Sequence, residues 1–216
     1  MQPHLGQPLV SAGEPLGQGR AVLVMVHGRG AAPANILDLV PRLDRPGLTY
    51  LAPTAAGKTW YPQSFMADRE GNEPGLSSGL KAVGRAVDQA LAAGVPSERI
   101  VLLGFSQGAC LTSEFAVRNA RRYGGVIAYT GGLIGPPGTA WGHDGAFDGT
   151  PVFLGCSDVD AHVPLVRVEE SAAVFARMGA AVTKRIYAGM GHVVNDDEIR
   201  FTQRLLDGLT PSARDL

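Results

Sequence analysis

The stretch Ile100–Ala109, which reads Ile-Val-Leu-Leu-Gly-Phe-Ser-Gln-Gly-Ala, contains the strongest structural signal of the chain. Its apolar start, its Gly-x-Ser-x-Gly pattern and the helical residues that follow predict a buried strand, a sharp turn and a helix. Such a turn strains and crowds the serine backbone, and Gly104 and Gly108 relieve the crowding because they have no Cβ. The turn would lift the Ser106 hydroxyl above a sheet at a helix N-terminus, where developing negative charge is favoured. The stretch therefore predicts a serine nucleophile.

Short apolar runs alternate with longer helical patterns along the rest of the chain, which is typical of βα units and a mostly parallel sheet. The predicted strands are Ala21–Val26, Leu48–Ala52, Ile100–Leu103, Val126–Tyr129, Val152–Leu154 and Val182–Tyr187, with an antiparallel strand around Leu9-Val10. The predicted helices are 35–44, 78–92, 107–121, 165–178 and 195–208. Together with the serine turn, this pattern predicts an α/β-hydrolase fold with helices on both faces of the sheet. We expect one domain over residues 1–216 and no large cap, and the long loops at 54–77 and 133–150 are expected to be either functional or disordered.

The composition excludes several classes of protein. With 216 residues, 45% hydrophobic and 18% charged, and a net charge of −1, the chain has no basic surface for nucleic acid or anionic lipid. The longest apolar run, Ala21–Val26, is far short of the ~20 residues that span a bilayer, and the N-terminus lacks the pattern of a secretory signal. Cys110 and Cys156 are too few for a disulfide framework or a zinc site and leave a single disulfide as the alternative. We expect a cytoplasmic protein without metal or cofactor that acts on a small molecule, as a monomer or a homodimer.

A serine nucleophile needs a base, and the base needs a third group that holds its tautomer. In α/β-hydrolases the chain order is serine, acid, histidine. Of the five histidines, His143, His162 and His192 follow Ser106. His192 ends the glycine-rich stretch Tyr187–His192 after the last predicted strand, and we predict that it is the base. We expect His143 to be a solvated loop residue, and His162 lies too close in sequence to the expected acid to be its partner.

The acid is expected just after the predicted strand Val152–Leu154. Two candidates stand there, Asp158 and Asp160. The residues alone leave both open.

The predicted strand Ala21–Val26 runs directly into His27-Gly28-Arg29-Gly30. In α/β-hydrolases a loop after an early strand supplies one backbone N–H to the oxyanion, and the residue after the nucleophile supplies the other. This rule nominates the backbone amides of Arg29 and Gln107. The Arg29 side chain either meets an anionic substrate or is simply solvated.

Four segments together resemble the phospholipase/carboxylesterase family of small serine hydrolases, which includes the acyl-protein thioesterases. They are Val26–Gly30, Gly104–Ala109, Asp158–Pro164 and Tyr187–His192. The resemblance extends from about Ala21 to Leu206 and implies hydrolysis of carboxylic esters, or of thioesters, through an acyl-enzyme intermediate. In the family the acid stands four residues before the proline of a Val-Pro pair, which selects Asp160 and gives the triad Ser106, Asp160 and His192. The family usually has proline directly after this aspartate, whereas this chain has Ala161.

The resemblance also suggests the walls of a substrate pocket, with core packing as the alternative role for each residue. These are Trp60, Tyr61, Phe65, Leu133 and Met190. Because 54–77 is shorter than in the lipid-directed thioesterases and differently composed, we expect small or aromatic esters. Two other readings stay open. A dienelactone-hydrolase-like enzyme would have a cysteine in place of Ser106, and a non-catalytic binding module of the same fold would lack a triad member or a glycine of the turn.

Overall fold

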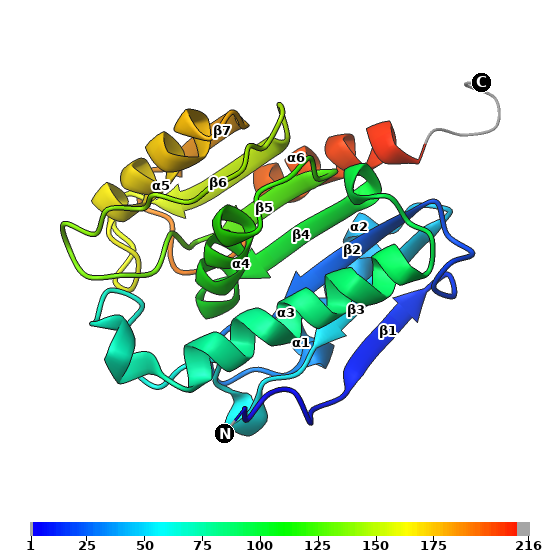
Figure 1. The fold of residues 1–216 in the computed structure, drawn as a ribbon. Helices are drawn as coiled ribbons and strands as arrows, with labels where there is room; N and C mark the ends of the chain where they lie inside the picture. Colours follow the sequence, from blue (N-terminus) through cyan, green and yellow to red (C-terminus); the bar gives the residue numbers. More distant parts are fainter. Residues whose placement is uncertain (1, 211–216) are drawn as a thin grey trace.

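A seven-stranded sheet forms the centre of the computed structural model, which describes residues 2–210 (Figure 1). The strand order is β1-β3-β2-β4-β5-β6-β7. β1 is antiparallel to β3, and every other neighbouring pair is parallel. The strands are β1 (Leu9–Gly13), β2 (Ala21–Val26), β3 (Leu48–Pro53), β4 (Ile100–Phe105), β5 (Gly125–Tyr129), β6 (Pro151–Ser157) and β7 (Ala181–Tyr187). All seven predicted strands are confirmed.

Helices cover both faces of the sheet, as predicted. One face packs against α3 (Gly75–Ala92), α4 (Gln107–Arg118) and α5 (Leu165–Arg177), and the other against α1 (Pro33–Leu37), α2 (Val40–Leu43) and α6 (Asp196–Leu209) (Figure 1). Alternate residues of β2 serve the two faces. Val22, Val24 and Val26 join the first layer, and Ala21, Leu23 and Met25 join the second. This two-sided burial explains why the strand is apolar throughout instead of alternating with polar residues.

The helix predicted over 35–44 is instead two short helices, α1 and α2, separated at Asp38 and Leu39. Pro41 lies in the first turn of α2, and it has no N–H to donate to the carbonyl of Leu37. A continuous helix would therefore lose a hydrogen bond at that point, and the chain breaks just before the proline.

The two long connections carry little regular structure. Within 54–77 there are short 3₁₀ helices at Ala56–Lys58 and Arg69–Asn72, followed by the first turn of α3. No cap is inserted anywhere in residues 2–210, and no helix of that part is long and apolar enough to cross a membrane. The domain predicted over 1–216 includes residue 1 and residues 211–216, which lie outside the described residues.

The parallel sheet gathers the predicted site residues at one edge. The carboxyl ends of parallel strands lie at the same edge of a sheet, where α/β proteins place their ligands. The loops after β2, β4, β6 and β7 therefore meet there.

Candidate active site

Ser106 occupies the turn between β4 and α4 in a conformation that is unusual for a side-chain-bearing residue. Its φ is 55° and its ψ −122°, and its backbone N–H donates to the carbonyl of Tyr129 at 3.0 Å. A Cβ on Gly104 would lie 2.3 Å from the carbonyl oxygen of Gly108, and a Cβ on Gly108 would lie 2.1 Å from that of Val26. Both positions are therefore restricted to glycine by the close approach of β2, β4 and α4. The strained serine conformation persists because the surrounding backbone leaves it no alternative.

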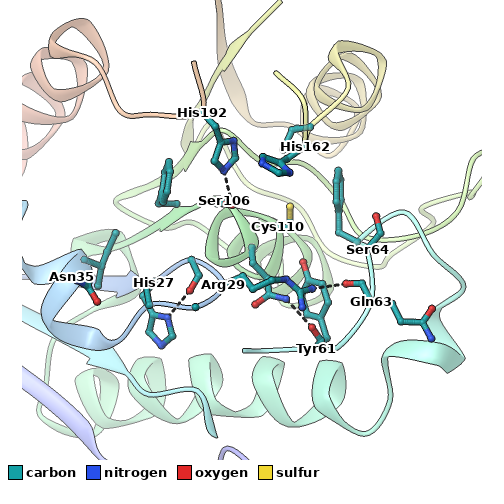
Figure 2. A pocket seen from close by; sticks show the side chains of 18 of the residues that line it. His27, Arg29, Asn35, Tyr61, Gln63, Ser64, Ser106, Cys110, His162 and His192 are labelled. Carbon is teal, nitrogen blue, oxygen red and sulfur yellow. Dashed lines mark hydrogen bonds between the residues drawn. The ribbon is translucent and has the colours of Figure 1, made fainter. Parts of the chain in front are cut away.

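A hydrogen-bonded chain connects Ser106, His192 and Asp160. The Ser106 Oγ lies 2.8 Å from His192 Nε2 (Figure 2). On the other side of the ring, His192 Nδ1 lies 2.8 Å from Asp160 Oδ2. An ionised carboxylate only accepts hydrogen bonds, so Nδ1 carries the ring proton and Nε2 is free to accept one from the serine. The ring of His192 lies between Phe105 and His162, with centroid distances of 5.2 and 4.8 Å. The structure thus brings the three predicted residues into direct contact.

Asp160 is held as a buried carboxylate. Its Oδ1 accepts backbone N–H bonds from His162 at 2.7 Å and Val163 at 2.9 Å, and its side chain has no exposed surface. Burial raises the pKa of Asp160, but the hydrogen bonds from His192 and from the two backbone amides outweigh burial and leave the pKa below its ordinary value. The carboxylate therefore stays ionised beside the imidazole.

Asp158, the other candidate acid, contacts a different part of the base loop. It is exposed, and its Oδ1 accepts the backbone N–H of Gly189 at 2.8 Å. Asp158 thereby ties the loop after β6 to the loop that carries His192.

The loop after β2 lies directly against Ser106. A Cβ on Gly28 would be 3.5 Å from the Cβ of Ser106. The backbone N–H groups of Arg29 and Gln107 have no acceptor among residues 2–210, and Gln107 begins α4, where the helix dipole is positive. Two unpaired donors at this position suit an anion that forms on a reacting carbonyl.

The buried side chain of His27 holds the conformation of the loop after β2. It is fully buried, its Nδ1 lies 2.9 Å from the carbonyl oxygen of Gly28, and its Nε2 accepts the backbone N–H of Ala55 at 3.2 Å. Burial lowers the pKa of His27, so the ring is neutral, and these partners place its proton on Nδ1. His27 precedes Ser106 in the chain and is excluded as the base by chain order, but it shapes the loop that carries the predicted oxyanion donor.

The side chain of Gln107 was not anticipated from the sequence. Its Oε1 accepts the backbone N–H of Trp60 at 2.9 Å and its Nε2 donates to the carbonyl of Tyr61 at 2.8 Å. The Trp60 indole in turn donates to the carbonyl of His27 at 2.8 Å. These bonds connect segments far apart in sequence, so local patterns could not reveal them. They attach the start of the 60–65 segment to the first residue of α4, directly after Ser106.

A cavity of about 830 Å³ opens onto Ser106 (Figure 2). Its walls come from the loop after β2, the 61–65 segment, the serine turn and the loop after Asp160. The lining side chains include Asn35, Ile36, Tyr61, Phe65, Cys110, His162 and Val163. Cys110, like Cys156, is a free and buried thiol.

The five residues proposed as pocket walls separate into two groups. Tyr61 and Phe65 line the cavity, whereas Trp60, Leu133 and Met190 do not. Trp60 and Leu133 are fully buried in the hydrophobic core, which is the alternative role that the sequence allowed. Met190 turns toward the start of α6, where its sulfur lies 3.0 Å from an amide nitrogen.

The other two histidines that follow Ser106 have different surroundings, and only His143 departs from expectation. His162 is exposed, lines the cavity and packs edge-on against His192, with 72° between the ring planes (Figure 2). The backbone N–H of His162 donates to Asp160, but its ring packs against the base and not against the acid. His143 does not line the cavity, and it is half-buried instead of solvated, because the 133–150 loop folds back toward Glu114 and Arg118.

Comparison with known proteins identifies the relatives of this chain. The sequence model of the phospholipase/carboxylesterase family matches residues 11–209. The chain belongs to this family. The resemblance that four sequence segments indicated is therefore confirmed, and with it a carboxylic ester hydrolase of the α/β-hydrolase fold.

Individual relatives and solved structures align over nearly the whole chain. A phospholipase/carboxylesterase from Dyadobacter fermentans is 42% identical, with a TM-score of 0.90 over 95% of this chain and 99% of that one. Acyl-protein thioesterase 1 of Eremothecium gossypii is 28% identical over 88% of this chain and 90% of its own. The carboxylesterase of Bacillus cereus shares the fold, with a TM-score of 0.73 at 19% identity over 96% and 97% of the two chains.

Proposed function

We propose that this member of the phospholipase/carboxylesterase family is a serine carboxylesterase that hydrolyses small carboxylic esters through an acyl-enzyme intermediate on Ser106. The observation that carries the proposal is the hydrogen-bonded chain from Ser106 through His192 to Asp160, with bonds of 2.8 Å at both ends of the imidazole. The unpaired amides of Arg29 and Gln107 beside it support an oxyanion hole.

The chemistry follows from these positions. Ser106 Oγ attacks the ester carbonyl while His192 Nε2 takes the hydroxyl proton, and the carbonyl oxygen becomes an oxyanion between the two backbone N–H groups. When the tetrahedral intermediate collapses, His192 returns the proton to the leaving alcohol and the acyl group remains on Ser106. Water then attacks the acyl-enzyme with His192 as the base, the bond between the acyl group and Ser106 Oγ breaks, the carboxylic acid leaves, and His192 returns the proton to Oγ. Asp160 stays ionised throughout and stabilises the imidazolium, which agrees with its lowered pKa.

Thioesters are the second candidate class of substrate. One relative is named an acyl-protein thioesterase, and the same acyl-enzyme chemistry expels a thiol as readily as an alcohol. A dienelactone-hydrolase-like enzyme is disfavoured by the serine at position 106, and a non-catalytic module by the complete hydrogen-bonded chain. The short acyl preference, a single domain over 1–216, the lack of a cofactor, the cytoplasmic location and homodimer formation stay predictions.

Covalent labelling tests the proposal. A fluorophosphonate should modify the wild-type protein at Ser106, and Ser106→Ala should lose both the label and at least about 10⁴-fold in ester turnover. Ser113→Ala is the matched control, because Ser113 lies in α4, the helix that follows Ser106, with a buried hydroxyl that has no partner among the described residues. It should keep the label and the activity. An adduct that peptide mass spectrometry locates on another residue would refute the assignment.

A further inference from the structure

The cavity beside Ser106 is lined by one permanently charged side chain. Among the described residues of its wall, Arg29 is a cation and there is no aspartate, glutamate or lysine. No carboxylate of the described residues forms an ion pair with Arg29, and Asp160, the acid next to the site, contacts His192 instead. The cavity therefore has an uncompensated positive charge next to the proposed reaction centre.

The guanidinium of Arg29 is oriented by neutral groups. It donates to the carbonyl oxygens of Pro62 at 2.9 Å and Gln63 at 2.6 Å, and its carbon lies 5.9 Å from the centre of the Tyr61 ring (Figure 2). A guanidinium carries five N–H bonds, so further donors remain, and Arg29 is exposed to the cavity. The carbonyls fix the plane of the group without removing its charge.

Many arginines of the described chain are paired with carboxylates, and others, such as Arg85, Arg122 and Arg177, are held by backbone carbonyls but do not line the cavity. Arg29 differs because it is held by carbonyls and also lines the cavity. The paired arginines include Arg42, Arg45, Arg118, Arg167 and Arg185. An arginine that is held in place in a cavity with spare donors and no counter-ion is suited to bind an anionic group of a ligand, and a carboxylate matches its planar fork.

We infer that Arg29 determines substrate specificity by binding a free carboxylate of the ester substrate. The inference rests on the proposed function and names its substrate class, a short ester that carries a second, ionised acid group. The backbone N–H of Arg29 is the proposed oxyanion donor, so its side chain starts from a residue next to the reacting carbonyl. Few atoms then separate the ester from the carboxylate, as in a half-ester of a short dicarboxylic acid or an acyl ester of a small hydroxy acid.

Matched pairs of substrates test the inference on the wild-type protein. Methyl hydrogen succinate carries the carboxylate in its acyl half, and methyl succinamate replaces that carboxylate by a neutral amide of the same shape. Acetoxyacetate and acetoxyacetamide form the corresponding pair for the alcohol half. We expect kcat/KM to favour the anion by roughly ten- to a hundredfold in at least one pair, the range for hydrogen bonds to charged groups. A ratio near one in both pairs would overturn the inference.

Variants locate the effect. Arg29→Gln should bring the ratio of the favoured pair close to one, and Arg29→Lys should give an intermediate ratio because it keeps the charge without the fork. Both substrates of a pair are measured on the same variant, so any disturbance of the Arg29 backbone N–H cancels in the ratio. Lys58→Gln is the charge control. Lys58 lies near Arg29 in the fold, because its backbone carbonyl accepts the N–H of Gly30 at 2.7 Å, but Lys58 does not line the cavity. The substitution therefore removes one positive charge close to the cavity and should leave the ratio unchanged.

The outcomes separate the inference from the proposed function. If the wild-type protein hydrolyses the neutral esters and Ser106→Ala does not, the proposed function is supported, whatever the ratios of kcat/KM between the paired substrates are. An unchanged ratio in Arg29→Gln, or an equal fall in Lys58→Gln, would then refute the role of Arg29 alone. If Arg29→Gln does not fold, the wild-type ratios and competitive inhibition by succinate but not succinamide decide the matter. If no ester is hydrolysed and Ser106 is not labelled, the proposed function itself fails.

Discussion

Around Ser106 the chain packs backbone against backbone, whereas the loop that carries His192 is held by a few polar contacts. An added Cβ on Gly108 would lie 2.1 Å from a backbone oxygen of β2, but added Cβ atoms on Gly189 and Gly191 would meet nothing within 4 Å. The base loop is instead tied down by the bond between Asp158 and the N–H of Gly189. The backbone turn of the proposed nucleophile is therefore fixed by the packing of the core, and the loop of the proposed base is attached by side chains that can be altered one at a time.

The largest effect that this difference predicts is on folding. Gly108→Ala forces a Cβ against the carbonyls of Val26 and His27, and no flexible side chain can move aside, so we expect a loss of more than about 4 kcal/mol or no folded protein. Gly191→Ala, without a positive φ or a close neighbour, should stay within ~1 kcal/mol of wild type. Urea unfolding of the two variants measures this. Similar midpoints would remove the distinction between the two regions.

Among the residues that hold or contact His192, the largest expected effect is a loss of kcat on substitution of Asp160. Asp160→Asn keeps the shape of the side chain but favours the wrong imidazole tautomer, and the same change in a serine protease lowers kcat by about 10⁴. We expect a loss of that order with little change in KM and a protein that remains folded. Steady-state kinetics on a neutral ester, with circular dichroism as the folding control, measures both. Activity within tenfold of wild type would exclude Asp160 as the acid.

The same contrast explains what could be predicted from the sequence. The strands and the serine turn were predictable because glycine spacing and apolar runs are local patterns. The contact that restricts Gly104 also lies within the turn, whereas Gly108 is restricted by the backbone of Val26 and His27, which is distant in sequence. The break between α1 and α2 also had a local cause in Pro41, which a purely periodic reading of 35–44 overlooks.

Other features depend on contacts across the fold. Asp158 and Asp160 are chemically alike, and only the path of the chain determines which one reaches a ring 32 residues away. Trp60 and Phe65 are both apolar and both buried, but only Phe65 also lines the cavity, while the backbone of Trp60 is bonded to the side chain of Gln107. Such choices follow from long-range geometry and leave no local pattern.

An effect of intermediate size is expected at Glu198, in the first turn of α6, which follows the loop that carries His192. It concerns how the stability of the protein depends on pH. Glu198 is buried in the first turn of α6, where one carboxyl oxygen accepts the N–H of Asn195 at 2.9 Å and the other has no partner among the described residues. Burial raises its pKa from 4.5 to about 7. A carboxyl with a raised pKa binds its proton more tightly in the folded state, so its contribution to stability is complete below pH 4.5 and is lost as the pH rises to about 7.

Glu198→Gln should remove this dependence, because the amide keeps the shape and does not ionise. At pH 8 we expect the variant to be more stable than wild type by on the order of 2–3 kcal/mol, and at pH 5 the difference should be much smaller. Denaturant unfolding at the two pH values measures the change, with the exposed Glu98→Gln as the control. A difference that does not depend on pH would show that Glu198 is ionised in the folded protein.

The smallest effect is expected at Asp158, the polar contact that attaches the base loop. In Asp158→Asn the side-chain oxygen can still accept the N–H of Gly189, and only the charge of the acceptor is lost. Asp158→Ala removes the bond completely, at a cost of about 1 kcal/mol. We expect less than a fivefold loss of kcat for the asparagine variant, roughly a fivefold loss for the alanine variant, and a lower unfolding temperature for the alanine variant. Because the two aspartates stand two residues apart and undergo the same substitution, their ratio of kcat values cancels general effects on the loop. If Asp158→Asn lost more kcat than Asp160→Asn, the acid would be Asp158, and the contacts of Asp160 with the two backbone amides would only order the turn.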